Sequence, residues 1–181
     1  MKKKIYKWIF SNWMGWKIRG TMDAAIQKSV IMVVPHTSWH DFYIGLITRG
    51  ILGLEMNYVA KKELFVFPFN FFFKWMGGAP LDRSATKNTV ENIASIFNQR
   101  KIFRLAISPE GTRKKVTEWK TGFYYIALKA GVPIIPVAFD YTNREVVLHP
   151  AFYPTGIIDA DFENLKLYFT DVKGKIPENS F

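Results

Sequence analysis

The sequence contains no cysteine. Disulfide bonds, thiol nucleophiles and thiolate metal ligands are therefore excluded. Long apolar runs are missing too, because none reaches the roughly 18–20 residues that a helix needs to span a bilayer. The N-terminus begins like a signal peptide, but Lys7 and Asn12 interrupt its apolar part and no small-residue cleavage site follows. We therefore expect this segment to be retained.

Acidic residues are few compared with basic ones. There are 15 Asp and Glu against 25 Lys and Arg, which gives a formal net charge of +10. Such an excess favours an anionic partner: nucleic acid, an anionic membrane surface or a phosphorylated small molecule. The chain has 181 residues, 49% hydrophobic and 22% charged, which predicts one folded domain with a substantial core.

Apolar runs bounded by Pro and Gly alternate with helical patterns. Strands are predicted at 30–34, 56–60, 102–107 and 132–139, with 145–148 able to pair beside the last of them. Helices are predicted at 42–52, near 90–97, at 123–130 and at about 159–173. The prolines of strand 132–139 favour an edge or an irregular ladder, and the tail after Gly174 is expected to be loose. The pattern indicates a single α/β domain with a mixed or mostly parallel sheet.

Tryptophan and lysine are interleaved in residues 1–20. The apolar positions recur at three- and four-residue steps and include Trp8, Trp13 and Trp16. A helix with this pattern is typical of membrane interfaces, so we predict a membrane-docking segment, residues 1–25, before the main domain, residues 26–181. A helix packed on the domain with lysine flanks is the alternative.

A second aromatic group lies in residues 64–76. Pro68 prevents one straight helix through this stretch. The aromatic side chains either fill the core or form an apolar rim that binds an alkyl chain or inserts into lipid. The residues concerned are Phe65, Phe67, Phe69, Phe71, Phe72, Phe73 and Trp75.

Polar residues directly follow the predicted strands. His36 comes after Pro35, which closes strand 30–34, and Asp41 starts the next helix. Across such a turn the carboxylate can hold one ring nitrogen and leave the other free to take a proton. Residues 108–113 follow strand 102–107 in the same way, and the carboxyl ends of strands are where open α/β sheets place their ligands.

The chemistry of these residues suggests direct transfer to a hydroxyl. If the strands are neighbours, a base with its orienting acid lies beside the guanidinium groups of Arg83 and Arg113. Guanidinium groups and the backbone N–H groups of a Gly–Thr turn suit a phosphate. No Ser or Cys lies in a recognisable nucleophile elbow, so His36 is predicted to take the proton of a substrate hydroxyl as that oxygen attacks.

Two other functional classes stay open on these residues. His36 and His40 have the i, i+4 spacing of a metal pair, which with Asp41 or Glu110 would suit a metal-dependent hydrolase, although the pair lies in a turn. The positive charge would suit a nucleic-acid- or membrane-binding module without catalysis, although no nucleic-acid motif is visible.

Four blocks, in this order along the chain, resemble the glycerolipid acyltransferases, the family typified by 1-acylglycerol-3-phosphate acyltransferase. The first is the H-x4-D pair formed by His36 and Asp41. The others are residues 78–83, the Pro-Glu-Gly-Thr-Arg run at 109–113, and residues 132–137. Together the blocks cover roughly residues 30–140.

The resemblance implies transfer of an acyl group from acyl-CoA or acyl-carrier protein to the hydroxyl of a lysophospholipid in phospholipid biosynthesis, with 1-acylglycerol-3-phosphate as the expected acceptor. It implies a sheet flanked by helices and an N-terminal membrane-docking element. His36 would be the base and Asp41 would orient it. The residues expected to hold the acceptor's phosphate are Arg83, Glu110, Gly111, Thr112 and Arg113.

Beyond the donor and acceptor, we expect no metal, no bound cofactor and no nucleic-acid partner. Acyl-CoA and acyl-carrier protein are cytosolic, and the basic N-terminus suits anionic lipid. The resemblance therefore implies a peripheral protein on the cytoplasmic face of the cell membrane.

Overall fold

The computed structural model describes residues 2–61, 77–81 and 89–181. These residues form a seven-stranded sheet with the strand order β1-β7-β6-β2-β5-β3-β4. Within it, only β6 and β7 pair antiparallel. The predicted mixed, mostly parallel sheet is therefore confirmed. The strands are β1 (Lys17–Arg19), β2 (Lys28–Val34), β3 (Asn57–Lys61), β4 (Gly78–Leu81), β5 (Phe103–Ile107), β6 (Ile134–Asp140) and β7 (Glu145–Leu148).

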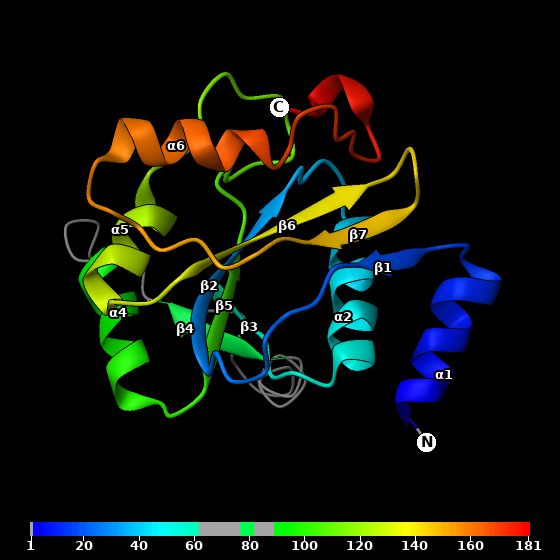
Figure 1. Ribbon diagram of the computed structural model, residues 1–181, viewed down its shortest axis with the longest axis horizontal. Coiled ribbons are helices and arrows are strands. Elements are labelled where there is room, and N and C mark those ends of the chain that lie inside the picture. The colour runs from blue at the N-terminus through cyan, green and yellow to red at the C-terminus, as the bar shows by residue number, and fades with distance from the viewer. Residues whose placement is uncertain (1, 62–76, 82–88) are drawn as a thin grey trace.

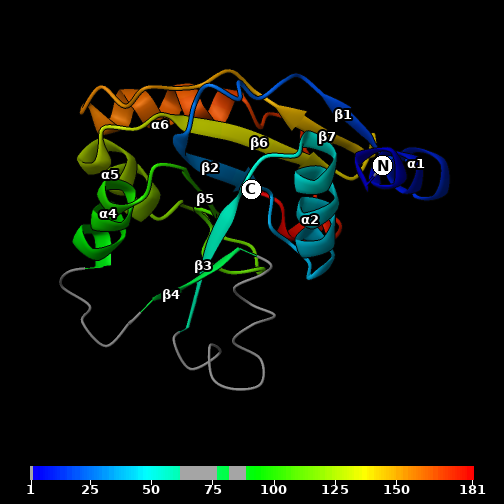
Figure 2. The ribbon, with the colours of Figure 1, turned by 90° about the horizontal axis from the view of Figure 1, so that it is seen from below.

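Helices cover both faces of the sheet (Figures 1 and 2). Strand β2 is buried on both sides, as its continuous apolar run requires. Val30 and Met32 point into a core shared with helices α4, α5 and α6, while Ile31 points into a second core against α2. The bounds are α1 (Lys2–Trp8), α2 (His40–Leu52), α4 (Thr89–Gln99), α5 (Gly122–Ala130) and α6 (Ile158–Leu167).

Of the two alternatives predicted for strand 132–139, an edge position or an irregular ladder, the edge position is wrong. Strand β6 pairs with β2 on one side and with β7 on the other, and every residue in it is buried. Pro136 is tolerated because the β6–β7 pairing begins one residue later, where Val137 faces Leu148. The N–H group that proline lacks is therefore not needed in that ladder.

The N-terminal segment is only partly the predicted amphipathic helix. Helix α1 continues into a π-helix (Ile9–Trp13), and Gly15, with φ of +70°, then turns the chain into β1. Trp8 and Trp13 are 62% and 79% exposed, but Trp16 is only 6% exposed. Its assignment to the membrane-docking surface is thus contradicted, because the turn at Gly15 directs the chain inward and Trp16 packs between Phe10 and Tyr141.

The expected boundary between residues 25 and 26 does not separate two units. Strand β1 lies before it, yet pairs parallel with β7 in the sheet. The sheet therefore includes residues 17–19, and the part of the chain that stands outside it at this end is α1 with the following π-helix.

The C-terminal tail is not loose. Helix α6 ends at Leu167, earlier than expected, and the chain then runs back toward the carboxyl ends of the central strands. The Gly174 N–H donates to the Ser180 hydroxyl at 2.9 Å, and the Ile176 N–H donates to the Thr37 hydroxyl at 3.1 Å. The tail therefore packs beside the loop that carries His36.

Candidate active site

The topology brings the two predicted polar loops together. Strands β2 and β5 are parallel neighbours, with Val30 facing Leu105. Their carboxyl ends therefore lie at one edge of the sheet, and the residues that follow each strand meet there. The contact is direct, since the backbone N–H of His36 donates to a carboxylate oxygen of Glu110 at 2.5 Å.

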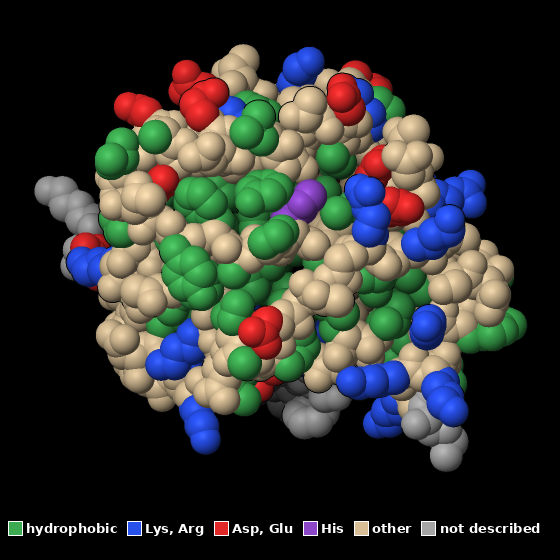
Figure 3. Space-filling view, in the orientation of Figure 1, with side chains coloured by type: hydrophobic (Ala, Val, Ile, Leu, Met, Phe, Trp, Pro, Cys, Tyr) green, Lys and Arg blue, Asp and Glu red, His purple; other side chains and the backbone are tan. Residues whose placement is uncertain are grey.

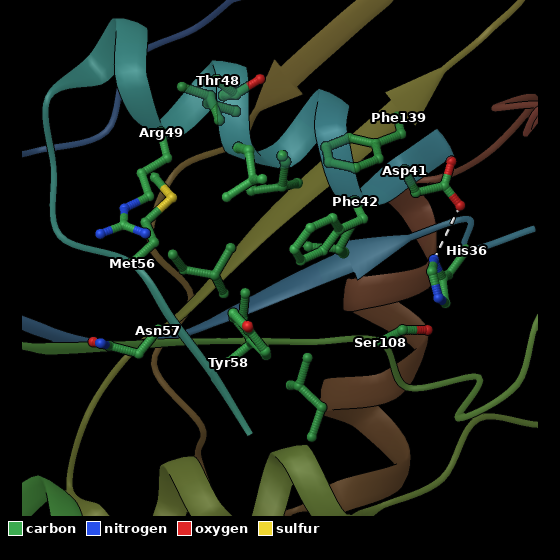
Figure 4. A pocket seen from close by; sticks show the side chains of 18 of the residues that line it. His36, Asp41, Phe42, Thr48, Arg49, Met56, Asn57, Tyr58, Ser108 and Phe139 are labelled. Carbon is green, nitrogen blue, oxygen red and sulfur yellow. Dashed lines mark hydrogen bonds and ion pairs between the residues drawn. The ribbon is translucent and has the colours of Figure 1, made fainter. Parts of the chain in front are cut away.

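His36 and Asp41 fold back on each other as predicted. The His36 Nδ1 lies 3.0 Å from the Asp41 Oδ2 (Figure 4). A carboxylate only accepts hydrogen bonds, so Nδ1 carries the proton and Nε2 is left free to accept one. The side chain of Asp41 is 2% exposed and that of His36 is 33% exposed, so the acid is shielded while the imidazole can be reached from outside.

Asp41 has two further partners that sequence reasoning missed. Its Oδ2 also accepts the Ser38 N–H at 2.9 Å, and its Oδ1 accepts the Tyr141 hydroxyl at 2.6 Å. Tyr141 follows Asp41 by 100 residues and lies outside all four sequence blocks. No local spacing could have paired them. Only the placement of β6 beside β2 reveals the contact.

The Glu110 carboxylate contacts the protein itself rather than standing open to a phosphate as predicted. It is 2% exposed, and its Oε2 accepts both the His36 N–H and the Ser108 hydroxyl, the latter at 3.1 Å. A buried carboxylate would also repel a phosphate. Glu110 therefore ties the loop after β5 to the loop after β2.

We expect Glu110 to make stability depend on pH. Burial raises the pKa of Glu110, and its hydrogen bonds from His36 and Ser108 oppose part of that rise. The folded state then binds this proton more tightly than the unfolded state, so stability falls as the pH rises above 4.5 toward the raised value. Urea unfolding from pH 4 to 7.5 should show Glu110→Gln gaining stability relative to the parent as the pH rises. Glu163→Gln, at an exposed position, is the control. A difference in the free energy of unfolding between Glu110→Gln and the parent that does not change with pH would contradict the expectation.

The Gly–Thr–Arg turn carries exposed basic groups. Gly111 has φ of +63°, and a Cβ there would come within 2.9 Å of three atoms of the Lys120 side chain. Lys120 is anchored by its own N–H, which donates to the Pro109 carbonyl at 2.8 Å. Lys120 was missed from the sequence because it lies outside the motif. The phosphate roles of Gly111, Thr112 and Arg113 stay predictions.

The proposed metal pair has other partners. The Nδ1 of His40 lies 2.8 Å from the Ser38 hydroxyl, while the Nδ1 of His36 faces Asp41. Across residues 2–61, 77–81 and 89–181, no three His, Cys, Asp or Glu side chains form a group that could hold a metal ion. Arg83 and the aromatic residues predicted to line the acyl path, Phe65, Phe67, Phe69, Phe71, Phe72, Phe73 and Trp75, lie outside the described residues.

An apolar cavity of about 260 Å³ begins at His36. It runs between α2 and the sheet, and Figure 4 shows Phe42 of α2 and Tyr58 of β3 projecting into the space between them. At its other end lie Arg49 and Asn57. Apolar side chains dominate the wall, including Met22, Ile31, Val33, Leu46, Met56, Ile107, Val137, Phe139 and Leu148. The His36 imidazole therefore lies at one end of a space lined mainly by apolar side chains.

Known proteins resemble this chain in sequence. The 1-acyl-sn-glycerol-3-phosphate acyltransferase of Salmonella typhimurium is 37% identical over 137 residues, which cover 72% of this chain and 55% of that protein. The enzyme of the same name from Escherichia coli strain K12 is 36% identical over 137 residues, with the same coverage of 72% and 55%. This chain thus spans about half the length of the curated relatives it matches.

The fold is shared with the crystal structure of the 1-acyl-sn-glycerophosphate (LPA) acyltransferase PlsC from Thermotoga maritima. The TM-score is 0.61 at 22% identity, over 93% of this chain and 77% of that one. The family model named Acyltransferase matches residues 16–140, which include the His36–Asp41 pair, the loop that carries Glu110 and all of β6. The chain therefore belongs to the acyltransferase family.

Proposed function

We propose that this chain transfers a fatty acyl group from a thioester donor, acyl-CoA or acyl-carrier protein, to the free hydroxyl of 1-acylglycerol-3-phosphate. One observation carries the proposal: the His36–Asp41 pair lies at one end of an apolar cavity (Figure 4). The names of the relatives in Salmonella typhimurium and Escherichia coli support the choice of acceptor.

In the proposed reaction His36 is a general base. Its Nε2 takes the hydroxyl proton while the acceptor oxygen attacks the thioester carbonyl, and the imidazolium then gives that proton to the departing thiolate. Asp41 stabilises the imidazolium and keeps the ring in the required tautomer. The products are the ester and the free thiol, so the reaction needs no cofactor beyond the donor.

The acceptor's phosphate is proposed to lie at the turn after β5. Arg113 is exposed there, and the Lys120 ammonium lies against Gly111. A guanidinium and an ammonium group beside a glycine turn are suited to a phosphomonoester. Glu110 has no part in this contact, because it holds the backbone of His36 instead.

The transferred acyl chain is proposed to occupy the cavity between α2 and the sheet. His36 is at one end of it (Figure 4), so a chain inside the cavity can place the thioester carbonyl beside the base. The apolar wall matches hydrocarbon, and burying a chain there contributes about 0.8 kcal/mol per CH₂ group.

We further propose that α1 and the π-helix after it bind the lipid surface that supplies the acceptor. Trp8 and Trp13 are exposed on this segment beside lysines 2, 3, 4 and 7. Figure 3 shows Lys and Arg side chains gathered where Figure 1 places α1. No helix among the described residues is long and apolar enough to cross a membrane. The proposal is peripheral binding to the anionic cytoplasmic face through interfacial aromatics and basic charge.

The double substitution Trp8→Ser/Trp13→Ser should weaken binding to vesicles containing anionic phospholipid by roughly 10- to 100-fold, because two large aromatic side chains no longer enter the interface. Co-sedimentation at fixed ionic strength measures this. Tyr153→Ser, an exposed aromatic in the segment between β7 and α6, is the matched control. Equal binding by the double variant and the parent would contradict docking through α1.

The decisive test of the function is a transfer assay with purified protein in detergent micelles. Long-chain acyl-CoA and acyl-carrier protein would each be offered with 1-acylglycerol-3-phosphate, and diacylated product would be measured. Product with either donor supports the proposal, and comparing the two identifies the donor. No product from either donor, with folded protein, would refute the assigned acceptor or reaction.

A further inference from the structure

Both oxygens of the Asp41 carboxylate are engaged, and each is held from a different part of the fold. The Oδ2 faces His36 at 3.0 Å and accepts the Ser38 N–H at 2.9 Å, both from the loop after β2. The Oδ1 accepts the hydroxyl of Tyr141, from the end of β6, at 2.6 Å. With bonds on both oxygens, the plane of the carboxylate is fixed.

The backbone places Tyr141 at this point. Strands β2 and β6 are parallel neighbours, so their carboxyl ends lie at the same edge of the sheet. Asp140 turns the chain immediately afterwards, because its side chain accepts the N–H groups of Thr142 and Asn143 at 2.9 and 3.2 Å. The Tyr141 N–H donates to the Lys173 carbonyl at 2.9 Å. The position of Tyr141 therefore does not depend on its bond to Asp41.

The ring and hydroxyl of Tyr141 are also constrained. Trp16 packs edge-on against the ring, with centroids 4.8 Å apart and an interplanar angle of 87°. Burial, then the hydrogen bond to Asp41, raise the pKa of Tyr141 far above its usual value. The hydroxyl thus stays protonated at any pH at which the protein would work. It donates its hydrogen bond to the Asp41 carboxylate over that whole range.

We propose that Tyr141 is a positioning residue for the transfer reaction, acting through Asp41 to fix the carboxylate that orients His36 and to draw off part of its charge. The proposal rests on the proposed function, in which His36 is the base. Tyr141 is not among the residues that line the cavity, so it has no contact with the acyl chain there.

The charge balance predicts what removal of the hydroxyl does. Among the described residues, the titratable groups that face His36 are Asp41 and Glu110, and those that face Asp41 also include Tyr43 and Tyr141. Without the Tyr141 donor, Asp41 keeps more negative charge beside the ring. The pair then takes up a proton at higher pH, and the carboxylate loses its fixed plane. The first change leaves less of the ring unprotonated at a given pH, and the second slows proton transfer by loosening the orientation of the ring. Neither alters substrate binding.

Tyr141→Phe is therefore expected to lower kcat roughly 10-fold, the effect of one lost hydrogen bond to a charged group, with KM within about twofold. The acid limb of the pH–rate profile should move to higher pH. The matched control is Tyr124→Phe, because Tyr124 donates a similar buried hydrogen bond to Asp161 at 2.7 Å, remote from the site. It should leave the pH profile where it is even if it lowers the melting temperature as much.

A double-mutant cycle shows whether Tyr141 acts through Asp41. If it does, Asp41→Asn/Tyr141→Phe loses no more activity than Asp41→Asn alone. Additive losses would overturn the proposal, as would an unchanged pH profile in Tyr141→Phe or an equal shift in Tyr124→Phe.

One readout is independent of turnover. An NMR titration of the His36 ring, assigned by comparison with His36→Gln, should show its midpoint at higher pH in Tyr141→Phe than in the parent. If neither the parent protein nor any variant transfers acyl groups, the proposed function fails. Separately, an unchanged midpoint of the His36 titration in Tyr141→Phe would refute the link from Tyr141 to His36.

Discussion

His36→Gln should reduce acyl transfer by roughly 10²–10⁴-fold, the usual contribution of a general base. Glutamine retains much of the size and polarity of histidine but cannot accept the hydroxyl proton. The backbone N–H that donates to Glu110 remains, so the loop keeps its tie to β5. The measurement is the initial rate of diacylated product at saturating donor and acceptor, with circular dichroism to show that the variant is folded.

His40→Gln is the matched control for this change. His40 lies four residues away in the same loop, but its Nδ1 faces Ser38 and not Asp41. It should retain activity within the same order of magnitude as the parent. Full activity in His36→Gln would refute the base assignment. Equal losses in both variants would instead implicate the two histidines as a unit, as a metal pair requires.

The second large effect is expected from filling the cavity. Gly45 of α2 lines it, and a Cβ there would lie 3.8 Å from the Phe139 ring, an ordinary contact. Gly45→Leu adds a branched side chain beyond that Cβ, into the space proposed for the acyl chain. We expect kcat/KM for a palmitoyl donor to fall on the order of 10- to 100-fold, from the ~1–3 kcal/mol that overfilling an apolar site costs.

Short donors provide the internal comparison, because an octanoyl chain need not pass the new side chain and should lose little. Gly45→Ala is the conservative control and should retain the palmitoyl rate, since among the described residues its methyl group meets only the Phe139 ring. Replacing a helical glycine also favours the helix by about 1 kcal/mol, so neither variant should unfold. A loss that is the same for octanoyl and palmitoyl donors would show that the transferred chain lies elsewhere.

The parts of the site that could be predicted are those encoded within a few residues. The buried run before Pro35 predicts strand β2, and the spacing of His36 and Asp41 predicts their contact across one turn. The strand that ends before Ser108 is equally clear. The meeting of their polar ends is conditional on the two strands being neighbours, and β2 and β5 are parallel neighbours in the sheet.

The parts that could not be predicted depend on contacts between distant residues. Trp16 has the spacing of an interfacial residue, yet the turn at Gly15 places it against Tyr141 in the interior. The motif around Glu110 suggests phosphate, yet burial makes its carboxylate a partner of the His36 backbone. Pro136 suggests an edge or an irregular ladder, yet β6 is an inner strand whose pairing with β7 starts just beyond this proline. In each case the tertiary environment, which sequence periodicity does not report, decides the role.

The C-terminal tail has a consequence for the order of events during synthesis. Thr37, next to His36, obtains its partner Ile176 from 139 residues later in the chain, and Trp119 of the Glu110 loop packs against Phe181 with ring centroids 4.8 Å apart. A ribosome will have made every strand of the sheet before it supplies these residues. The two loops of the site therefore gain these contacts last. A nascent or prematurely terminated chain carries His36 and Asp41 without the hydrogen bond from Ile176 to Thr37 and the packing of Phe181 on Trp119.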